Sequence, residues 1–249
     1  MVTKKGWSFG IITDGYHQSR VKRIIDSILS QKIKNFEIII VGDNNENYNY
    51  NDCSIKLVEF KSDEEWSDNN KVDTFPISIK KNLIVERAVY ENLCFLHDYV
   101  MLDKNWYLGI LKFEKNNEWK VLTNKILNSD NSRVFDWVLY DHPLCYRKVT
   151  YLPQNKKITK YQYIPGYYWC VKKNIMVEFK LNESLKWGQK EDVEWSKRVR
   201  KKYDFSFNNF SSVKFLKYKY GPWSKNNPKY KKVMLRTKFI KILVLLKLL

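Results

Sequence analysis

FLHDYVMLD, residues 95–103, is the stretch that decides the fold of this chain. An apolar run, Leu93–Leu96, leads directly into His97, Asp98 and Tyr99. The pattern predicts a buried strand that delivers three polar side chains at its carboxyl end. In open α/β sheets, ligands bind at that edge. The stretch therefore predicts a ligand site as well as a strand.

The residues before this stretch alternate between strand and helix patterns. Residues 7–13 (WSFGIIT) and 55–60 (IKLVEF) are typical of strands, and residues 36–41 (FEIIIV) are typical of a strand buried on both faces of a parallel sheet. One helix is expected after Ser19, which can cap it, and a second over residues 79–91. Because strands alternate with helices, we expect an α/β fold with a mostly parallel central sheet flanked by helices.

The composition narrows the class of protein. The chain has 249 residues, 44% of them hydrophobic, which suits one α/β domain with a small appendage. Its formal net charge of +18 predicts an anionic partner: nucleic acid, anionic lipid or a phosphorylated small molecule. Four widely separated cysteines without C-x-x-C spacing predict reduced core residues of a cytoplasmic protein, not zinc ligands. Residues 1–5 lead straight into a strand pattern, so we expect no signal peptide.

Aspartates follow three of the apolar runs: Asp14, Asp43 and Asp98. Each can be a turn residue or a helix cap. Three at one sheet edge can also bind the N–H groups of a base or the hydroxyls of a ribose. Lys80 and Lys81 could then face the phosphates of that nucleotide, although their spacing fits a solvated helix face better.

The chain resembles family 2-type glycosyltransferases of the GT-A fold over residues 7–220. The segments that carry the resemblance follow one another in order: Ile11–Asp14, Ile38–Asn44, Lys80–Asn82, Phe95–Val100 and Glu191–Trp195. The resemblance implies a GT-A-like, Rossmann-like sheet and transfer of a sugar from a nucleotide-sugar donor, with a UDP-sugar favoured.

The resemblance also implies roles for site residues. Asp14, Asp43 and the pair Lys81–Asn82 are implied to bind the nucleotide, and His97–Asp98 to hold the ribose and a divalent metal beside the diphosphate. The acidic pair Glu191–Asp192 is implied to lie near the acceptor, where one carboxylate is the base of an inverting reaction.

The metal site departs from the pattern of that family. Its triplet usually offers two or three carboxylates, whereas only Asp98 is acidic here, between His97 and Tyr99. Asp98 and His97 can ligate Mn²⁺, which accepts oxygen and imidazole donors, while Mg²⁺ would depend on Asp98, water and substrate phosphates. We expect a divalent metal, Mn²⁺ or Mg²⁺.

Sugar transfer also needs a base, because the acceptor hydroxyl loses a proton as it attacks. Asp192 is our first choice and Glu191 our second. The alternative explanation is that the acidic pair only stabilises a helix. A helix over residues 190–202 would carry acidic residues in its first turns and basic residues in its last, which is the distribution that the helix dipole favours.

Aromatic residues offer candidates for binding the acceptor. Sugar rings stack their apolar C–H faces on aromatic rings, and Tyr167, Tyr168 and Trp169 follow one another directly after a Pro-Gly turn. Trp187 lies just before the acidic pair and is a fourth candidate. Packing in the core is the alternative for each of them.

We expect residues 1–105 to form the nucleotide-sugar-binding half of the domain, residues 106–222 its acceptor-binding and catalytic half, and residues 223–249 a basic amphipathic tail. The tail is too often interrupted by lysine to span a membrane. It is expected to lie on an anionic membrane surface or, alternatively, to dock on protein. The residues expected to enter the membrane are Phe239, Ile240, Leu243 and Leu246. The acceptor would then be a glycan or a lipid-linked glycan of polysaccharide biosynthesis, extended at the cytoplasmic face.

Two other functions stay open. A nucleic-acid-binding protein would explain the charge and the 16% aromatic content, but the basic residues are spread along the chain and no binding motif appears. A sugar nucleotidyltransferase would share the sheet, but it normally has a Gly-rich, basic loop after the first strand, and residues 14–17 (DGYH) do not provide one.

Overall fold

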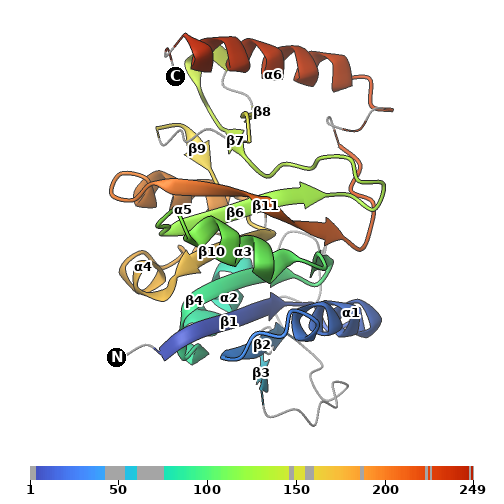
Figure 1. Ribbon diagram of the computed structural model, residues 1–249, viewed down its shortest axis with the longest axis vertical. Coiled ribbons are helices and arrows are strands. Elements are labelled where there is room, and N and C mark those ends of the chain that lie inside the picture. Colours follow the sequence, from blue (N-terminus) through green and yellow to red (C-terminus); the bar gives the residue numbers. More distant parts are fainter. Residues whose placement is uncertain are drawn as a thin grey trace.

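The computed structural model describes residues 4–42, 54–60, 76–145, 149–154, 160–185, 188–221, 224, 226–246 and 248. Within these residues one eight-stranded sheet has the order β3-β2-β1-β4-β10-β6-β11-β5 (Figure 1). Its strands are β1 (Lys4–Ile12), β2 (Phe36–Gly42), β3 (Ile55–Glu59), β4 (Tyr90–His97), β5 (Val100–Leu102), β6 (Val121–Leu127), β10 (Tyr168–Lys172) and β11 (Phe205–Phe215).

The sheet is mostly parallel, as the sequence predicts. β3, β2, β1 and β4 run in one direction, and β6 and β11 form a second parallel pair. β10 is antiparallel to both β4 and β6, and β5 is antiparallel to β11. A small antiparallel sheet lies beside it, with β7 (Val138–Leu139) between β8 (Thr150–Tyr151) and β9 (Gln162–Tyr163).

Helices cover both faces of the large sheet. α1 (Gln18–Leu29) and α3 (Trp106–Glu114) pack in one core cluster, and α2 (Ile77–Arg87) and α4 (Lys173–Glu178) pack in the other. α5 (Glu191–Val199) contributes to both clusters. The run of apolar residues in β2 follows from this arrangement: Ile38 and Ile40 belong to the first cluster, whereas Ile39 and Val41 belong to the second. Both faces of β2 are therefore buried.

Two predicted boundaries are wrong for local reasons. The helix expected over residues 79–91 ends at Arg87, because the N–H of Val89 donates to the buried carboxylate of Glu37 (2.6 Å) and β4 already starts at Tyr90. Ser19 does not cap α1, because it lies inside the first turn and His17 occupies the cap position.

The longest strand, β11, is absent from the sequence prediction. A bulge between Asn208 and Ser212 interrupts its pairing with β6, so the two-residue alternation breaks in the middle. Polar residues also point inward there: the amide of Asn208 donates to the carbonyl of Gly109 and to the hydroxyl of Ser211. The strand therefore lacks the apolar pattern of a buried strand.

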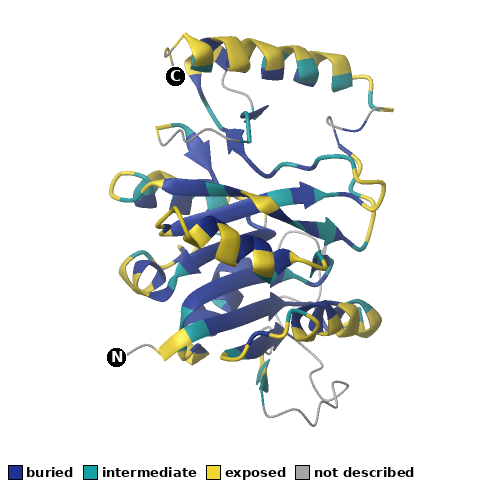
Figure 2. Ribbon diagram, in the orientation of Figure 1, coloured by how far each residue is buried: buried dark blue, intermediate teal, exposed yellow. Residues whose placement is uncertain are grey.

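The tail forms α6 (Tyr230–Leu245) at the end of the molecule opposite β3 (Figure 1). Val233, Thr237, Ile240 and Leu243 are buried against the rest of the chain. The prediction that Ile240 and Leu243 enter a membrane is therefore wrong, because these side chains are already used for packing. Apolar side chains on the outer face of α6 are exposed (Figure 2). In the part of the chain described, no helix combines the length and apolar character needed to cross a bilayer.

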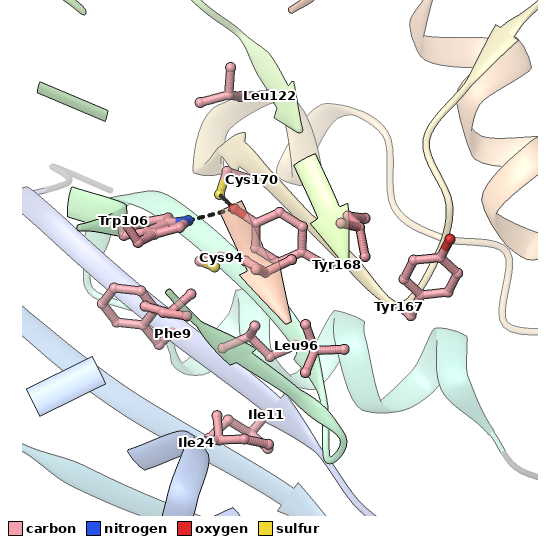
Figure 3. Close-up of a cluster of buried hydrophobic side chains, with 14 of the residues drawn as sticks. Phe9, Ile11, Ile24, Cys94, Leu96, Trp106, Leu122, Tyr167, Tyr168 and Cys170 are labelled. Atoms are coloured by element: carbon pink, nitrogen blue, oxygen red, sulfur yellow. Dashed lines mark hydrogen bonds between the residues drawn. The ribbon is translucent and has the colours of Figure 1, made fainter. Parts of the chain in front are cut away.

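The three described cysteines, Cys94, Cys145 and Cys170, are free and buried, as expected, and Cys53 lies outside the described residues. The two halves of the sequence meet where β10 pairs with β4, and Tyr168 of β10 lies in one buried cluster with Phe9, Ile11 and Leu96 (Figure 3). Its hydroxyl accepts a hydrogen bond from Trp106 Nε1 (2.7 Å) and donates one to Asn124 Oδ1 (2.6 Å). Strands from both halves of the sequence thus share one core.

Candidate functional site

A cleft of about 500 Å³ opens at the carboxyl ends of the central strands. β1 ends at Ile12, β4 ends at His97, and the N–H of Asp98 continues their ladder by donating to the carbonyl of Ile12 (3.2 Å). Residues that follow β11 form the opposite wall, held by Leu216 N–H donating to the carbonyl of Tyr99 (2.8 Å). The cleft is lined by Ile12, Asp14, His17, Ile77, His97, Asp98, Tyr99, Lys217, Tyr218, Lys219 and Tyr220.

Two carboxylates of the sequence prediction face this cleft together. Asp98 is buried, and its Oδ2 accepts a hydrogen bond from Thr13 Oγ1 (3.1 Å). Burial raises the pKa of Asp98, and the neighbouring Asp14 raises it further. Asp14 in turn accepts from the N–H of Tyr16 (3.0 Å), which fixes the turn after β1. The pair is a concentration of negative charge that a cation or a ribose hydroxyl can satisfy.

His97 is held as a neutral imidazole. Burial lowers the pKa of His97 well below its ordinary value, and the nearby ammonium groups of Lys81, Lys219 and Lys217 lower it further. Its Nε2 atom is buried without a hydrogen-bond partner among the described residues. A neutral ring with an unused nitrogen can accept a hydrogen bond or ligate a metal.

The second wall contains residues that the sequence analysis missed. Lys217 Nζ lies 4.3 Å from the ring centroid of Tyr99, and Lys219 Nζ lies 4.4 Å from that of Tyr167. Burial lowers the pKa of Lys219 to about 8, and repulsion from Lys217 acts in the same direction. The available signal was the alternation Lys217-Tyr218-Lys219-Tyr220, which becomes informative only once β11 is known to end at this sheet edge.

The acidic pair begins α5 and contacts the turn that precedes β10. The N–H of Gly166 donates to Asp192 Oδ2 (2.8 Å), and the carbonyl of Gly166 accepts from Lys81 Nζ (2.6 Å). A Cβ atom at Gly166 would lie 2.9 Å from Glu191 Oε1, so a side chain at this position would require the carboxylate of Glu191 to shift. The next residue, Tyr167, bonds through its carbonyl to the N–H of His97 (3.1 Å). Asp192 and His97 are thus connected by hydrogen bonds to two consecutive residues, Gly166 and Tyr167.

Asp192 has an unusually high proton affinity. Burial, with repulsion from Glu191, raises the pKa of Asp192 to about 6, against the opposing influence of Lys81 and of the N–H groups of Gly166 and Val193. Burial also lowers the pKa of Lys81. A carboxylate of this kind is ionised at neutral pH but accepts a proton more readily than an exposed one.

The lysine pair on α2 does not lie on a solvated helix face, so that interpretation is wrong. Lys80 and Lys81 are both buried, and Lys80 Nζ donates to the carbonyl of Thr13 (2.8 Å). Asn82 is buried as well, and its amide bonds to the main chain of Leu181 in both directions (2.9 and 3.1 Å) and to Glu183. None of these three residues lines the cleft. They fix the surrounding loops.

The expected aromatic floor for an acceptor does not form from Tyr168 and Trp169, which are core residues. Tyr168 packs beneath α3, and Trp169 packs against Phe95 and Trp195 on the other face of the sheet. Consecutive strand residues point to opposite faces, and both faces are buried here. Tyr167 differs, because its ring is contacted by Lys219 next to the cleft. Asp43 and Trp187 lie outside the described residues.

The side chains at the cleft limit the kind of metal ion that could bind there. No group of three or more His, Cys, Asp or Glu side chains within the described ranges is arranged to hold a metal ion. Asp98 offers one carboxylate and His97 one imidazole nitrogen, with Asp14 as a neighbouring carboxylate. Such a set fits a divalent cation that takes most of its ligands from water and substrate phosphates.

Comparison with known proteins identifies the fold. The chain is similar to a structure of S. aureus TarS 1–349, with a TM-score of 0.55 and 11% identity over 83% of this chain and 60% of that chain. A structure of S. aureus TarS 1–349 in complex with UDP also has a TM-score of 0.55 and 11% identity, over 84% and 60%. GalNAc-T7 with UDP, GalNAc and Mn²⁺ has a TM-score of 0.62 and 12% identity, over 96% and 48%.

These solved structures are glycosyltransferases, and the fold of this chain is GT-A-like. The chain spans between 48% and 60% of the length of the solved chains. No family model and no curated protein sequence matches it.

Proposed function

We propose that this chain is a glycosyltransferase that moves a sugar from a nucleotide-sugar donor, with a UDP-sugar favoured, to a hydroxyl of a glycan or lipid-linked acceptor. The observation that carries the proposal is the joining of two sites at one sheet edge. The Asp98 cleft lies at the end of β4, and the Asp192 carboxylate is tied to the same edge through Gly166 and Tyr167. A cleft for the donor beside a base for the acceptor is what sugar transfer requires.

The donor is assigned to the cleft. The carboxylates of Asp98 and Asp14 suit ribose hydroxyls, and Asp98 with His97 would hold the divalent cation. When bound, such a cation neutralises charge that develops on the departing diphosphate. Asp43, Lys81 and Asn82 remain assigned to nucleotide binding by the resemblance, although the buried positions of Lys81 and Asn82 favour an indirect role through the loops that they fix.

The acceptor reaction is assigned to Asp192. Its carboxylate takes the proton of the acceptor hydroxyl while the acceptor oxygen forms a bond to the anomeric carbon. The bond from that carbon to the diphosphate oxygen breaks, and UDP leaves with the bonding electrons. A single displacement inverts the anomeric configuration. The raised pKa of Asp192, about 6, favours this proton transfer near neutral pH.

The outer face of α6 supports an acceptor at a membrane. Leu235, Phe239, Ile242 and Leu246 are exposed at spacings of i, i+4, i+7 and i+11, so they form one apolar stripe. The helix contains five basic residues and no acidic ones: Lys231, Lys232, Arg236, Lys238 and Lys241. An apolar stripe on a purely basic helix fits an anionic lipid surface.

Calorimetric titration tests the donor assignment. We expect the purified protein to bind UDP in preference to GDP or CMP, with tighter binding when Mn²⁺ is present. Asp98→Asn should weaken binding ~10-fold or more and remove most of the Mn²⁺ effect. Asp26→Asn, on the exposed surface of α1, is the matched control and should bind like the unmodified protein.

Other outcomes would redirect the proposal. Failure to bind any nucleotide, combined with salt-sensitive binding of random oligonucleotides at physiological ionic strength, would favour a nucleic-acid-binding protein. If the protein slowly releases pyrophosphate when it is incubated with UTP and a sugar phosphate, a sugar nucleotidyltransferase would be favoured.

A further inference from the structure

Two lysines on the wall after β11 are arranged as a pair of ammonium groups above aromatic rings. Lys217 Nζ lies over Tyr99, and Lys219 Nζ lies over Tyr167 at 4.4 Å and near the rings of Phe215 (5.7 Å) and Tyr99 (6.0 Å). The aromatic faces restrict where the charged ends of both side chains can lie. The main chain at Lys219 is fixed by Asn128, whose Oδ1 accepts from the N–H of Lys219 (3.0 Å).

Carboxylates act on the positive charge of this pair from a distance: Asp192 raises the pKa of Lys219, and Lys217 lowers the pKa of Asp98. No carboxylate lies within ion-pair distance of Lys217 or Lys219 in the described ranges of the chain. The depressed pKa of Lys219, about 8, follows from burial and from Lys217. Two like charges held together at a cost in free energy indicate a site prepared for an anion, since an anion between them would remove the repulsion.

The opposite wall sets the kind of anion. Asp14 and Asp98 occupy the β1 and β4 side of the same cleft, where an anion would be repelled and a hydroxyl or a cation would be accepted. The cleft is therefore polarised, with negative charge at one wall and positive charge at the other. A ligand that carries a ribose at one end and phosphates at the other fits this polarity.

We propose that Lys217 and Lys219 bind the two phosphates of the nucleoside diphosphate, so that the protein itself supplies the cationic stabilisation of the leaving group. This inference rests on the proposed function. As the anomeric carbon to oxygen bond breaks, negative charge grows on the diphosphate oxygen, and the two ammonium groups lie on the wall that this charge would face. Binding of the diphosphate then persists when divalent metal is removed.

Titrations in EDTA test this assignment, with UDP, UMP and inorganic pyrophosphate as probes. We expect the unmodified protein to bind UDP at least ~10-fold more tightly than UMP in EDTA, and to bind pyrophosphate. Lys217→Gln/Lys219→Gln should weaken binding of UMP, which keeps one phosphate, less than binding of UDP, and should lose the preference for UDP and the binding of pyrophosphate. The single variant Lys217→Gln, at an exposed position, should lose part of the preference without affecting the fold. Lys231→Gln/Lys232→Gln on α6 changes the net charge equally and should leave all three affinities unchanged.

Each outcome separates this inference from the proposed function. If UDP binds only with Mn²⁺, and both cleft lysine variants bind it as the unmodified protein does, the inference is overturned while the glycosyltransferase proposal stands. If pyrophosphate binds through the lysines but no nucleotide does, the anion site is supported and the donor assignment fails. If neither UDP nor pyrophosphate binds under any condition, both are overturned.

Discussion

Gly166 is the residue at which the proposed donor and acceptor sites come into contact. Its N–H binds Asp192, its carbonyl binds Lys81, and a side chain at this position would displace the carboxylate of Glu191. Lys81 is therefore better described as a positioning residue than as a phosphate ligand. Its charge also keeps two adjacent carboxylates together, since Glu191 and Asp192 repel one another in a buried place.

The proposed base, Asp192, gives a prediction about activity. Asp192→Asn should lower the rate of UDP release in a transfer assay ~10²- to 10⁴-fold, because the acceptor hydroxyl loses its base. In the unmodified protein, activity should fall as the pH drops through about 6, where the carboxylate becomes protonated. If Glu191→Gln abolishes activity and Asp192→Asn does not, the base is Glu191. The charged groups that act on this carboxylate are Lys81, Glu191 and Lys219.

Asp192 also gives a prediction about stability, whose dependence on pH is opposite to that of the activity. The pKa of Asp192 is higher in the folded protein than in the unfolded chain, so its contribution to stability is present at low pH and is lost as the pH rises through about 6. Asp192→Asn removes this buried charge while keeping an acceptor for the N–H of Gly166. Thermal melts at pH 8 should therefore show an unchanged or higher Tm for the inactive variant. A clear drop in Tm would mean that the ionised carboxylate is needed for folding.

α1, β11 and α6 differ in how well a local pattern predicts the packing of an element. In α1 the apolar residues Val21, Ile24, Ile25 and Ile28 recur at helical spacing and are buried. β11 escapes prediction because its bulge breaks the alternation and its inward polar groups find partners in α3, in β6 and within β11 itself. In α6 the sequence pattern shows that apolar and basic residues mix, but only packing against the rest of the chain separates Ile240 and Leu243, which are buried, from Phe239 and Ile242, which are exposed.

The exposed stripe of α6 leads to a prediction about membranes. Leu235→Ser/Phe239→Ser/Ile242→Ser should lose most binding to vesicles that contain anionic lipid in a flotation assay, because the inserted apolar area is removed. The triple variant Leu108→Ser/Leu111→Ser/Val177→Ser, at exposed apolar positions on α3 and α4, is the matched control. Deletion of residues 228–249 is a less clean test, since it also uncovers the core beneath α6. Undiminished flotation of the α6 variant would rule out the stripe as the membrane contact.

One sheet joins the segments assigned to donor and acceptor. β4 from the first segment pairs with β10 from the second, and Tyr168 packs in the same core cluster as Phe9 and Leu96 of the first segment. We therefore expect a single cooperative unfolding transition in urea, with tryptophan fluorescence and far-UV circular dichroism coinciding. Tyr168→Phe leaves Trp106 Nε1 and Asn124 Oδ1 without a partner and should cost about 1–3 kcal/mol of stability without splitting the transition. The exposed Tyr16→Phe should have no effect, and two separate transitions would mean that the halves fold independently.

Local patterns along the chain predict the fold class and one edge of the site. Apolar runs such as that of β2 and the periodicity of α1 are local signals, while His97 ends its strand and Asp14 and Asp98 come within two residues of the ends of theirs. The other features of the site depend on tertiary contacts. Lys217 and Lys219 reach the cleft because β11 lies two strands from β10 and ends at the same edge, and Tyr168 and Trp169 are core residues because both faces of β10 are covered. Strand order and the covering of a face depend on residues far apart in the chain, so no local pattern records them.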